Sequence, residues 1–525
     1  MRSDLRVSSL LPLVLVCVLR ASCAPAQAVG PEFRVNSYTT EKQQRPRIAT
    51  NSSGNFVVAW MSTAQDGSGE GVFGQRYAST GAPLGTGFQV NTYTTGAQNL
   101  PSVAIDSGGS FVVVWQNATQ DGSSYGIFGQ RYGSAGAPLG AEFQVNTYTT
   151  DAQGYPSVAS ASGGNFVAVW QSDQFGGVFG QRFSSTGTPL GTEFLVSTYT
   201  TGGQSRPIVA SDPGGNFVVV WQNGAQDGSI FGVFGQRYSS AGTPLGAGFL
   251  VNTYTTNGQF SASVASGPDG SFVVTWNSYT QDSSFFGVFG QRYSSSGGPL
   301  GGEFRLNTYT TGIQRSSSVA SDSGGNFVAL WQSDNQDGFK DGVFGQRYGS
   351  AGEPLGGEFR VNTYTTSYQN YPSVASSSGG SFVVVWQGDS QDGSLYGVFS
   401  QRYCPTLSSV TASVNGTTTV CTNSTGGTAT VTEASGGLAT HQWGYRTMSG
   451  GATTSIPGQT GTSYVINGAN FPPAGGFFYL VCRTFPDCGV ATFSNEVLIG
   501  VTSDMMTAPI VTPPSALTTT QTLCM

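Results

Sequence analysis

Charge is scarce in this sequence, and positive charge is the scarcest. Charged residues make up 9% of the chain, the formal net charge is −7, and lysine occurs only at Lys42 and Lys340. A chain with so few cations lacks the basic face that neutralises a phosphate backbone. Nucleic acid is therefore not an expected partner.

Long apolar runs are missing, with one exception at the start of the chain. Arg2 and Arg6 precede the apolar residues 10–19, and Ala26-Gln27-Ala28 follows them. This order is typical of a secretory signal peptide, so we expect residues 1–28 to be removed and the mature protein to be secreted or held at the cell surface. No later stretch is long and apolar enough for a membrane-spanning helix, so we expect no transmembrane segment.

Cysteine is absent between Cys23 and Cys404. Two of the seven cysteines belong to the predicted signal peptide, and the other five lie after the repeats described below. Export permits disulfides among them. These five are Cys404, Cys421, Cys482, Cys488 and Cys524.

Glycine and repetition are what the chain has in excess. Glycine occurs 76 times, about twice its usual share, as expected of many short strands joined by tight turns. The phrase Phe-x-Val-Asn-Thr-Tyr-Thr-Thr, with small variations, recurs seven times at intervals of 55 residues, with one interval of 51. A fixed period of this length is typical of repeat architectures. The seven copies begin at Phe33, Phe88, Phe143, Phe194, Phe249, Phe304 and Phe359.

Each repeat contains four candidate strands. A run that ends in tryptophan is apolar at nearly every position, which predicts a strand covered on both faces. The Gly-Val-Phe-Gly-Gln-Arg-Tyr run alternates more, so we expect it further out. Turns rich in glycine and proline separate these runs. Four such strands are expected to form one blade of a β-propeller.

The two ends of the repeat region are complementary. The seventh repeat ends at Tyr403 without a following Phe-x-Val-Asn strand, whereas the mature chain begins with a spare one at residues 32–36. Pairing them would complete the seventh blade and remove exposed sheet edges. We therefore expect an all-β fold in which residues 29–403 form a seven-bladed β-propeller closed by the N-terminal strand.

These repeats resemble those of secreted bacterial β-propeller proteins that carry Gly-Asn-Phe-Val-Val-Val-Trp and Gly-Val-Phe-Gly-Gln-Arg-Tyr. The resemblance covers residues 32–403. It implies a propeller in an extracellular protein and assigns no chemistry.

Residues 404–502 follow a different pattern. Cys421, Trp443 and Cys482 occur in the order of the inter-sheet disulfide and the packed tryptophan of an immunoglobulin-like β-sandwich. This segment resembles the Ig-like modules of bacterial surface proteins, which implies a disulfide between Cys421 and Cys482. The pairing of Cys404 and Cys488 stays open. Residues 503–525 repeat the opening of this domain, which predicts a truncated and poorly ordered second copy.

The repeats also present polar residues on one face of the expected ring. Each repeat carries a tyrosine followed five residues later by a glutamine, and most carry an aspartate in a facing turn. Tyrosine stacking and amide hydrogen bonds suit a neutral glycan, bound up to seven times. The competing interpretation is that these residues merely form turns and tie neighbouring blades together. The tyrosines are Tyr38, Tyr93, Tyr148, Tyr199, Tyr254, Tyr309 and Tyr364, and the glutamines are Gln43, Gln98, Gln153, Gln204, Gln259, Gln314 and Gln369.

Two further repeated residues are interpreted as structural. The tryptophans are expected in the core between blades. The arginine of each Gln-Arg-Tyr run has an acidic neighbour in its own repeat, so we expect ion pairs within each blade. These arginines are Arg76, Arg131, Arg182, Arg237, Arg292, Arg347 and Arg402.

Signatures of catalysis are sparse. The single histidine, His441, lies outside the repeats, and no Walker loop is present. One carboxylate per turn falls short of a calcium site. We therefore expect no catalytic residue, cofactor or metal, and a monomeric, non-enzymatic adhesion module that binds extracellular glycan or protein. Two alternatives stay open: an architectural spacer, and a polysaccharide-active enzyme whose few catalytic residues break the symmetry of the repeats.

Overall fold

The computed structural model describes residues 27–404, apart from 174–175, 198–201 and 394. After residue 404 it describes several short stretches. The later stretches are 410–415, 419–421, 425–433, 439–449, 452–460, 463–471, 476–486, 492–494 and 496–502. The predicted signal peptide up to residue 26 and the predicted truncated copy at 503–525 lie outside the described residues.

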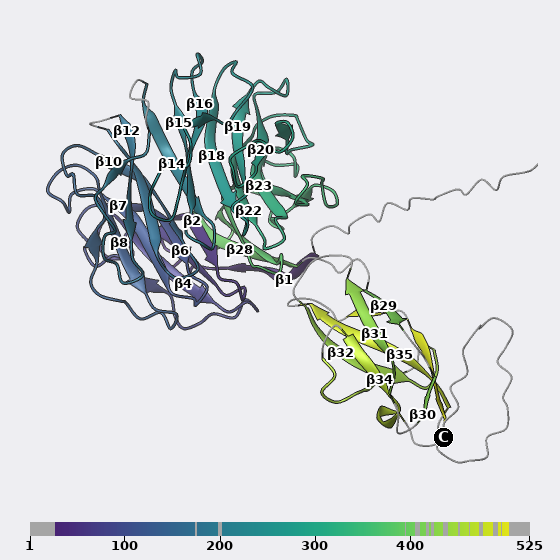
Figure 1. The fold of residues 1–525 in the computed structure, drawn as a ribbon. Coiled ribbons are helices and arrows are strands. Elements are labelled where there is room, and N and C mark those ends of the chain that lie inside the picture. Colours follow the sequence, from purple (N-terminus) through teal and green to yellow (C-terminus); the bar gives the residue numbers. More distant parts are fainter. Residues whose placement is uncertain are drawn as a thin grey trace, which may run out of the picture.

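The repeats fold into seven four-stranded antiparallel sheets (Figure 1). The first strands of the sheets lie next to one another, and we call them the inner strands. They are β2 (Gln43–Thr50), β6 (Gln98–Ile105), β10 (Gln153–Ser160), β14 (Gln204–Ser211), β18 (Gln259–Ser266), β22 (Gln314–Ser321) and β26 (Gln369–Ser376).

The second strands carry the tryptophans. They are β3 (Phe56–Thr63), β7 (Phe111–Asn117), β11 (Phe166–Ser172), β15 (Phe217–Asn223), β19 (Phe272–Tyr279), β23 (Phe327–Asp334) and β27 (Phe382–Asp389). The third strands carry the Gln-Arg-Tyr runs. They are β4 (Glu70–Tyr77), β8 (Gly126–Tyr132), β12 (Gly177–Phe183), β16 (Gly232–Tyr238), β20 (Phe286–Tyr293), β24 (Asp341–Tyr348) and β28 (Tyr396–Cys404).

The fourth strands are short in six sheets. They are β5 (Phe88–Gln89), β9 (Phe143–Gln144), β13 (Phe194–Leu195), β17 (Phe249–Leu250), β21 (Phe304–Arg305) and β25 (Phe359–Arg360). In the seventh sheet the fourth place is taken by β1 (Gln27–Arg34), which pairs with β28 through Phe33–Ser400 and Arg34–Phe399. The expected pairing of the first strand with the last repeat is thus present. β1 begins two residues before the predicted start of the mature chain.

The second strands are buried on both faces, as their apolar runs predict. Every residue of β7 is buried, and Trp115 has no exposed surface. The core around it combines residues of two sheets, such as Ala59 of β3 and Val113 of β7. Each tryptophan strand is therefore covered by the neighbouring sheet, and the tryptophans are core residues.

An aromatic residue at or near the end of each third strand stacks on a phenylalanine of the second strand. Tyr132 stacks on Phe111 of the second strand at 4.7 Å between ring centres, and its hydroxyl donates to the Val90 carbonyl at 3.3 Å. The same contacts recur at Tyr238, whose hydroxyl donates to the Val196 carbonyl at 3.2 Å. Burial raises the pKa of both phenols.

The repeated arginines correct one expectation. Arg76 donates to the carbonyls of Ala135 at 2.5 Å and Ser134 at 2.6 Å, both in the turn of the next sheet. Arg402 donates in the same way to the Thr80 carbonyl at 2.6 Å. The expected ion pairs within each blade are therefore replaced by bonds between sheets at Arg76 and Arg402. A planar guanidinium can satisfy two carbonyls at once, so it ties neighbouring sheets together.

The segment after Cys404 forms two further sheets. One contains β29 (Val410–Asn415), β31 (Thr425–Glu433) and β34 (Ser463–Asn467). The other contains β30 (Thr419–Cys421), β32 (Ala439–Arg446), β33 (Thr454–Ser455), β35 (Gly476–Pro486), β36 (Thr492–Phe493) and β37 (Val497–Thr502). A short 3₁₀ helix, η1 (Gly468–Asn470), follows β34.

Both sheets contribute to one core. It contains Trp443, Cys482, Tyr464 and Ala429, all nearly or fully buried. The side chain of Cys421 lies outside the described residues, so its disulfide with Cys482 stays a prediction. Within the described part of the chain, no helix is long and apolar enough to span a membrane.

The buried tyrosines predict a loss of stability at alkaline pH. Because burial raises their pKa, the unfolded chain releases these protons first, so the stability is full below the ordinary tyrosine pKa of about 10 and falls above it. The slope is about 1.4 kcal/mol per pH unit for each tyrosine. The tyrosines are Tyr77, Tyr132, Tyr238, Tyr293, Tyr348 and Tyr403.

Urea unfolding between about pH 9 and pH 11 measures this slope. Tyr238→Phe should reduce this slope by the contribution of one tyrosine. Phe183→Tyr, at the equivalent position of the third sheet, should increase the slope by a similar contribution. Equal slopes in the two variants would contradict the assignment.

Candidate functional site

All seven inner strands line one cavity of about 310 Å³, which we call the central cavity. Each inner strand enters it through a β-bulge, seen in β2 as a register shift between Gln44 and Arg47. The same shift occurs in the other six inner strands. Bulges re-aim side chains and often lie beside active sites.

One residue in each bulge has a left-handed backbone. Its φ lies between 51° and 57° in all seven sheets. Glycine adopts this conformation without strain, yet none of the seven residues is glycine. Strain of this kind costs about 1–3 kcal/mol and clusters at functional sites. The seven residues are Arg45, Leu100, Tyr155, Arg206, Ser261, Ser316 and Tyr371, and all of them line the central cavity.

Glutamines of neighbouring sheets hold several of these bulges. The backbone N–H of Tyr155 donates to Gln116 Oε1 at 3.0 Å, and that of Arg45 donates to Gln387 Oε1 at 3.0 Å. Both glutamines directly follow a core tryptophan in the preceding sheet. The rigid core therefore fixes the backbone from which the cavity side chains project.

Two arginine–tyrosine pairs stand at the cavity. The Arg45 guanidinium lies 4.0 Å from the centre of the Tyr371 ring, and the Arg206 guanidinium lies 5.5 Å from that of Tyr155. In each pair the tyrosine comes from the sheet that precedes the arginine's own. Such contacts orient the guanidinium without using its hydrogen-bond donors.

A third arginine, Arg47, also lines the central cavity. Its side chain is partly accessible, and the surrounding protein lowers its pKa to about 10, first through burial and then through the charge of Arg45. Among the described residues, its one side-chain hydrogen bond goes to the Pro46 carbonyl, at 3.2 Å. At neutral pH Arg47 is therefore a cation with most of its donors unused.

A second cavity of about 320 Å³ adjoins the central one, and we call it the rim cavity. It shares Arg45, Arg206 and Tyr371 with the central cavity and adds Arg315 and Gln332. The guanidinium of each of these three arginines can donate several hydrogen bonds.

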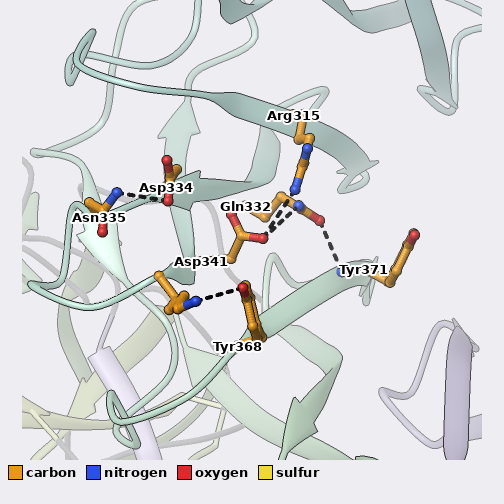
Figure 2. A network of polar contacts seen from close by, with 8 residues as sticks. Arg315, Gln332, Asp334, Asn335, Asp341, Tyr368 and Tyr371 are labelled. Carbon is orange, nitrogen blue, oxygen red and sulfur yellow. Dashed lines mark hydrogen bonds and ion pairs between the residues drawn. The ribbon is translucent and has the colours of Figure 1, made fainter.

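Arg315 forms an ion pair with Asp341 (Figure 2). Its Nη2 lies 3.2 Å from Asp341 Oδ2, and the Gln332 amide lies 3.4 Å from the same oxygen. Asp341 is 4% exposed, and desolvation raises the pKa of its carboxyl although Arg315 opposes the shift. Asp341 is therefore a positioning residue for Arg315.

The Gln332 amide connects this pair to the bulge residues. It accepts from the Tyr371 N–H at 3.3 Å. Turned by half a rotation, the same amide would donate to Ser316 Oγ at 3.0 Å and accept from Arg315. In either orientation it lies between Arg315 and a residue of the central cavity.

Two further contacts lie in nearby loops, one within the sixth sheet and one between the sixth and seventh sheets. Lys340 Nζ donates to the Tyr368 hydroxyl at 2.9 Å, and Asn335 donates to Asp334 at 2.9 Å (Figure 2). Arg315 and Asp341 occur together in one repeat alone. A different pair forms where the first and second sheets meet, because Asn99, the counterpart of Arg315 in the second sheet, donates to Glu70 of the first sheet at 2.7 Å.

The glutamines predicted to bind a ligand are buried. Each is at most 3% exposed. Gln98 shows their role, because its Oε1 accepts from Asn91 at 3.2 Å and its Nε2 donates to the Thr95 carbonyl at 2.9 Å. This burial and these bonds favour the competing structural interpretation, and a ligand contact of the glutamines stays a prediction. They are Gln43, Gln98, Gln153, Gln204, Gln259, Gln314 and Gln369.

The predicted tyrosines are partly exposed where they are described. Tyr38, Tyr93, Tyr148, Tyr254, Tyr309 and Tyr364 follow the fourth strands and precede the inner strands, so their loops lie at the end of the sheets that carries the bulges. Tyr199 lies outside the described residues. A ligand contact of these tyrosines stays a prediction.

The aspartates of the facing turns support the backbone. Asp66 Oδ1 accepts from the Ser68 N–H at 3.2 Å, and its Oδ2 accepts from Asn91 at 3.4 Å. This arrangement is an Asx turn tied to the neighbouring loop. Among the described residues, no group of three or more histidine, cysteine, aspartate or glutamate side chains could hold a metal ion.

The cavity residues were not among those expected from the sequence. A signal for them is present, because the second and third residues of each Gln-x-x-Pro-Ser motif, or its variant, change from repeat to repeat whereas the initial glutamine recurs in all seven. The shortened third repeat is another departure from the symmetry of the repeats. Its Asp173 accepts from Gln171 at 3.2 Å, and the next two residues lie outside the described part.

Comparisons with known proteins give only distant likenesses. No protein-family model and no curated protein matches this chain. A protein of unknown function from Dyadobacter fermentans is 9% identical over 71% of this chain and 99% of its own, with a TM-score of 0.44. A fungal alcohol oxidase of the AA5 family, in complex with copper, is 14% identical over 90% and 99%, with a TM-score of 0.45.

An α-L-arabinanase from Penicillium chrysogenum, complexed with arabinobiose, is 13% identical over 72% of this chain and 98% of its own, with a TM-score of 0.41. Other similar structures are described as a glycoside hydrolase, arabinofuranosidases and an endo-arabinase. These comparisons contradict our expectation of a non-enzymatic adhesion module. Likenesses this distant transfer neither substrate nor catalytic residue, so the activity is argued from the cavities themselves.

The burial of the glutamines predicts a stability defect when one is replaced. Gln259→Leu should lower the free energy of unfolding by about 1–3 kcal/mol, because the Asn252 amide and the Thr256 carbonyl lose their partner. Chemical denaturation measures this loss. Tyr254→Ala, in the same loop but partly exposed, is the control and should cost less. The reverse order of the two losses would contradict the structural role.

Proposed function

We propose that this protein is a polysaccharide-active enzyme whose site is formed by the central and rim cavities. The observation that carries the proposal is the gathering of the residues that break the repeat. Repeated residues build the core and tie the sheets, whereas the seven bulge residues, among them Arg45, Arg206 and Tyr371, vary between arginine, tyrosine, serine and leucine and meet at one place. A symmetric scaffold needs such variable positions to direct one reaction at one bond.

The cavity side chains suit a carbohydrate chain. Guanidinium and phenol groups donate hydrogen bonds to sugar hydroxyl and ring oxygens, and the serines both donate and accept. The strained bulges hold these groups in place before a substrate binds, which reduces the cost of ordering them. The partly exposed tyrosines of the outer loops offer additional contacts to the chain beyond the cavities.

The architecture that we propose around this site is a seven-bladed propeller followed by an Ig-like domain. Pairing of β1 with β28 supports closure, as does the 2.8 Å hydrogen bond from Thr50 Oγ1 in β2 to the Ser376 carbonyl in β26. The shared core of Trp443 and Cys482 supports an Ig-like sandwich with a Cys421–Cys482 disulfide. Secretion after removal of residues 1–28 would bring the enzyme to extracellular polysaccharides.

The test is cleavage of a panel of neutral and acidic polysaccharides by the full mature chain. Release of reducing ends measures cleavage by any route, and ultraviolet absorbance of unsaturated ends separates elimination from hydrolysis. We expect cleavage of at least one polymer, with the rate reduced about 10-fold or more in the Tyr155→Ala, Tyr371→Ala double variant.

The matched control is the Tyr93→Ala, Tyr148→Ala double variant, which removes two tyrosines from the outer loops at the same end of the sheets. Its rate should fall less than that of the cavity variant. An absence of new ends with every polymer, or an equal loss in both variants, would refute the proposed site.

A further inference from the structure

Arg47 is an exception in a ring of hydrogen bonds around the central cavity. At its position most inner strands carry serine, which accepts an N–H from the next sheet. Ser102 Oγ accepts from Val158 at 3.1 Å, and Ser157 Oγ accepts from Val209 at 3.1 Å. Arg47 has no oxygen in its side chain for this bond. The fold itself therefore gives no reason for an arginine at this position.

The environment makes this arginine costly. Although its side chain is partly accessible, burial by the neighbouring protein disfavours the charge of its guanidinium, and the nearby charge of Arg45 adds repulsion. Placing a cation in such surroundings requires compensation by an opposite charge or by hydrogen bonds. In the described part of the chain, Arg315 forms an ion pair with Asp341 and Arg446 forms one with Glu496, and neither pair involves Arg47.

Several arginines meet at the two cavities of an otherwise acidic protein. The central cavity is lined by Arg45, Arg47 and Arg206, and the adjoining rim cavity adds Arg315, while the formal net charge of the chain is −7. No acidic residue lines either cavity among the described residues. The local field in the cavities is therefore opposite in sign to that of the whole molecule.

We propose that the central cavity is an anion subsite, in which Arg47, with Arg45 and Arg206, binds a carboxylate or sulfate group carried by a saccharide. A guanidinium binds such a group through paired charge-assisted hydrogen bonds. The anion provides the compensation that Arg47 lacks within the protein. This inference rests on the proposed function for the saccharide, and it narrows the substrate class to acidic polysaccharides.

Calorimetric binding to the full mature chain tests the subsite without requiring turnover. The probes are an oligogalacturonate, its neutral methyl ester and a sulfated oligosaccharide of equal length. We expect one of the two acidic probes to bind about 10-fold or more tightly than the ester, and the stronger one identifies the anion. Binding should weaken as the salt concentration rises.

Arg47→Ser is the decisive variant, because it introduces the residue that most other repeats carry. It should weaken acidic-probe binding about 10-fold or more, leave the ester unaffected, and preserve or raise the melting temperature. Arg360→Ser removes the same charge from the exposed fourth strand β25 and should leave binding unchanged.

Two results would overturn the subsite. One is equal binding of the acidic probes and the ester, or no binding of either acidic probe, by the wild-type protein. The other is equal affinity of Arg47→Ser and wild type for the acidic probe. Anion binding without cleavage of any polymer would refute the proposed enzyme and leave the subsite standing, so the two failures are distinguishable.

Discussion

The structure depends on one constraint, which is that every second strand must be covered on both faces. The run from Phe111 to Asn117 is buried at every residue, and a single four-stranded sheet exposes both of its faces to water. Apolar surface of this size is stable only when another sheet lies against each face. A sheet in the middle of a row meets this requirement, and the first and last sheets meet it only by packing on each other. The core that joins Phe56 and Val385 does so.

Packing of this kind brings the inner strands together and creates the cavities. The repeated residues stabilise this packing, because Trp115 lies in the core, Arg76 connects one sheet to the next, and Gln98 forms hydrogen bonds within a loop. Repetition therefore marks structural residues in this chain. The residues free to differ are those that face the central space, where no neighbouring sheet dictates their shape.

The contrast between Arg76 and Arg47 shows why residue type alone misleads. Both are arginines in strands, and neither takes part in an ion pair among the described residues. Arg76 reaches two carbonyls of the next sheet and so has a structural role. Arg47 bonds one carbonyl beside it and faces a cavity shared with two further arginines. In the sequence, Arg76 has an acidic neighbour in its repeat, and Arg47 has no special feature. The roles of both arginines became visible only from the contacts between sheets.

Local pattern was enough to determine the all-β class, the seven repeats, the tryptophan core and the pairing of the first strand with the last repeat. These features follow from the alternation of apolar residues, from turn residues and from the matching ends of the repeat region. Each of these patterns can be recognised within a few residues or by comparing whole strands along the sequence. The buried glutamines, the ties between sheets and the arginine-lined cavities were decided by the tertiary structure. They join residues as distant as Arg45 and Tyr371, which meet only because the last sheet packs beside the first.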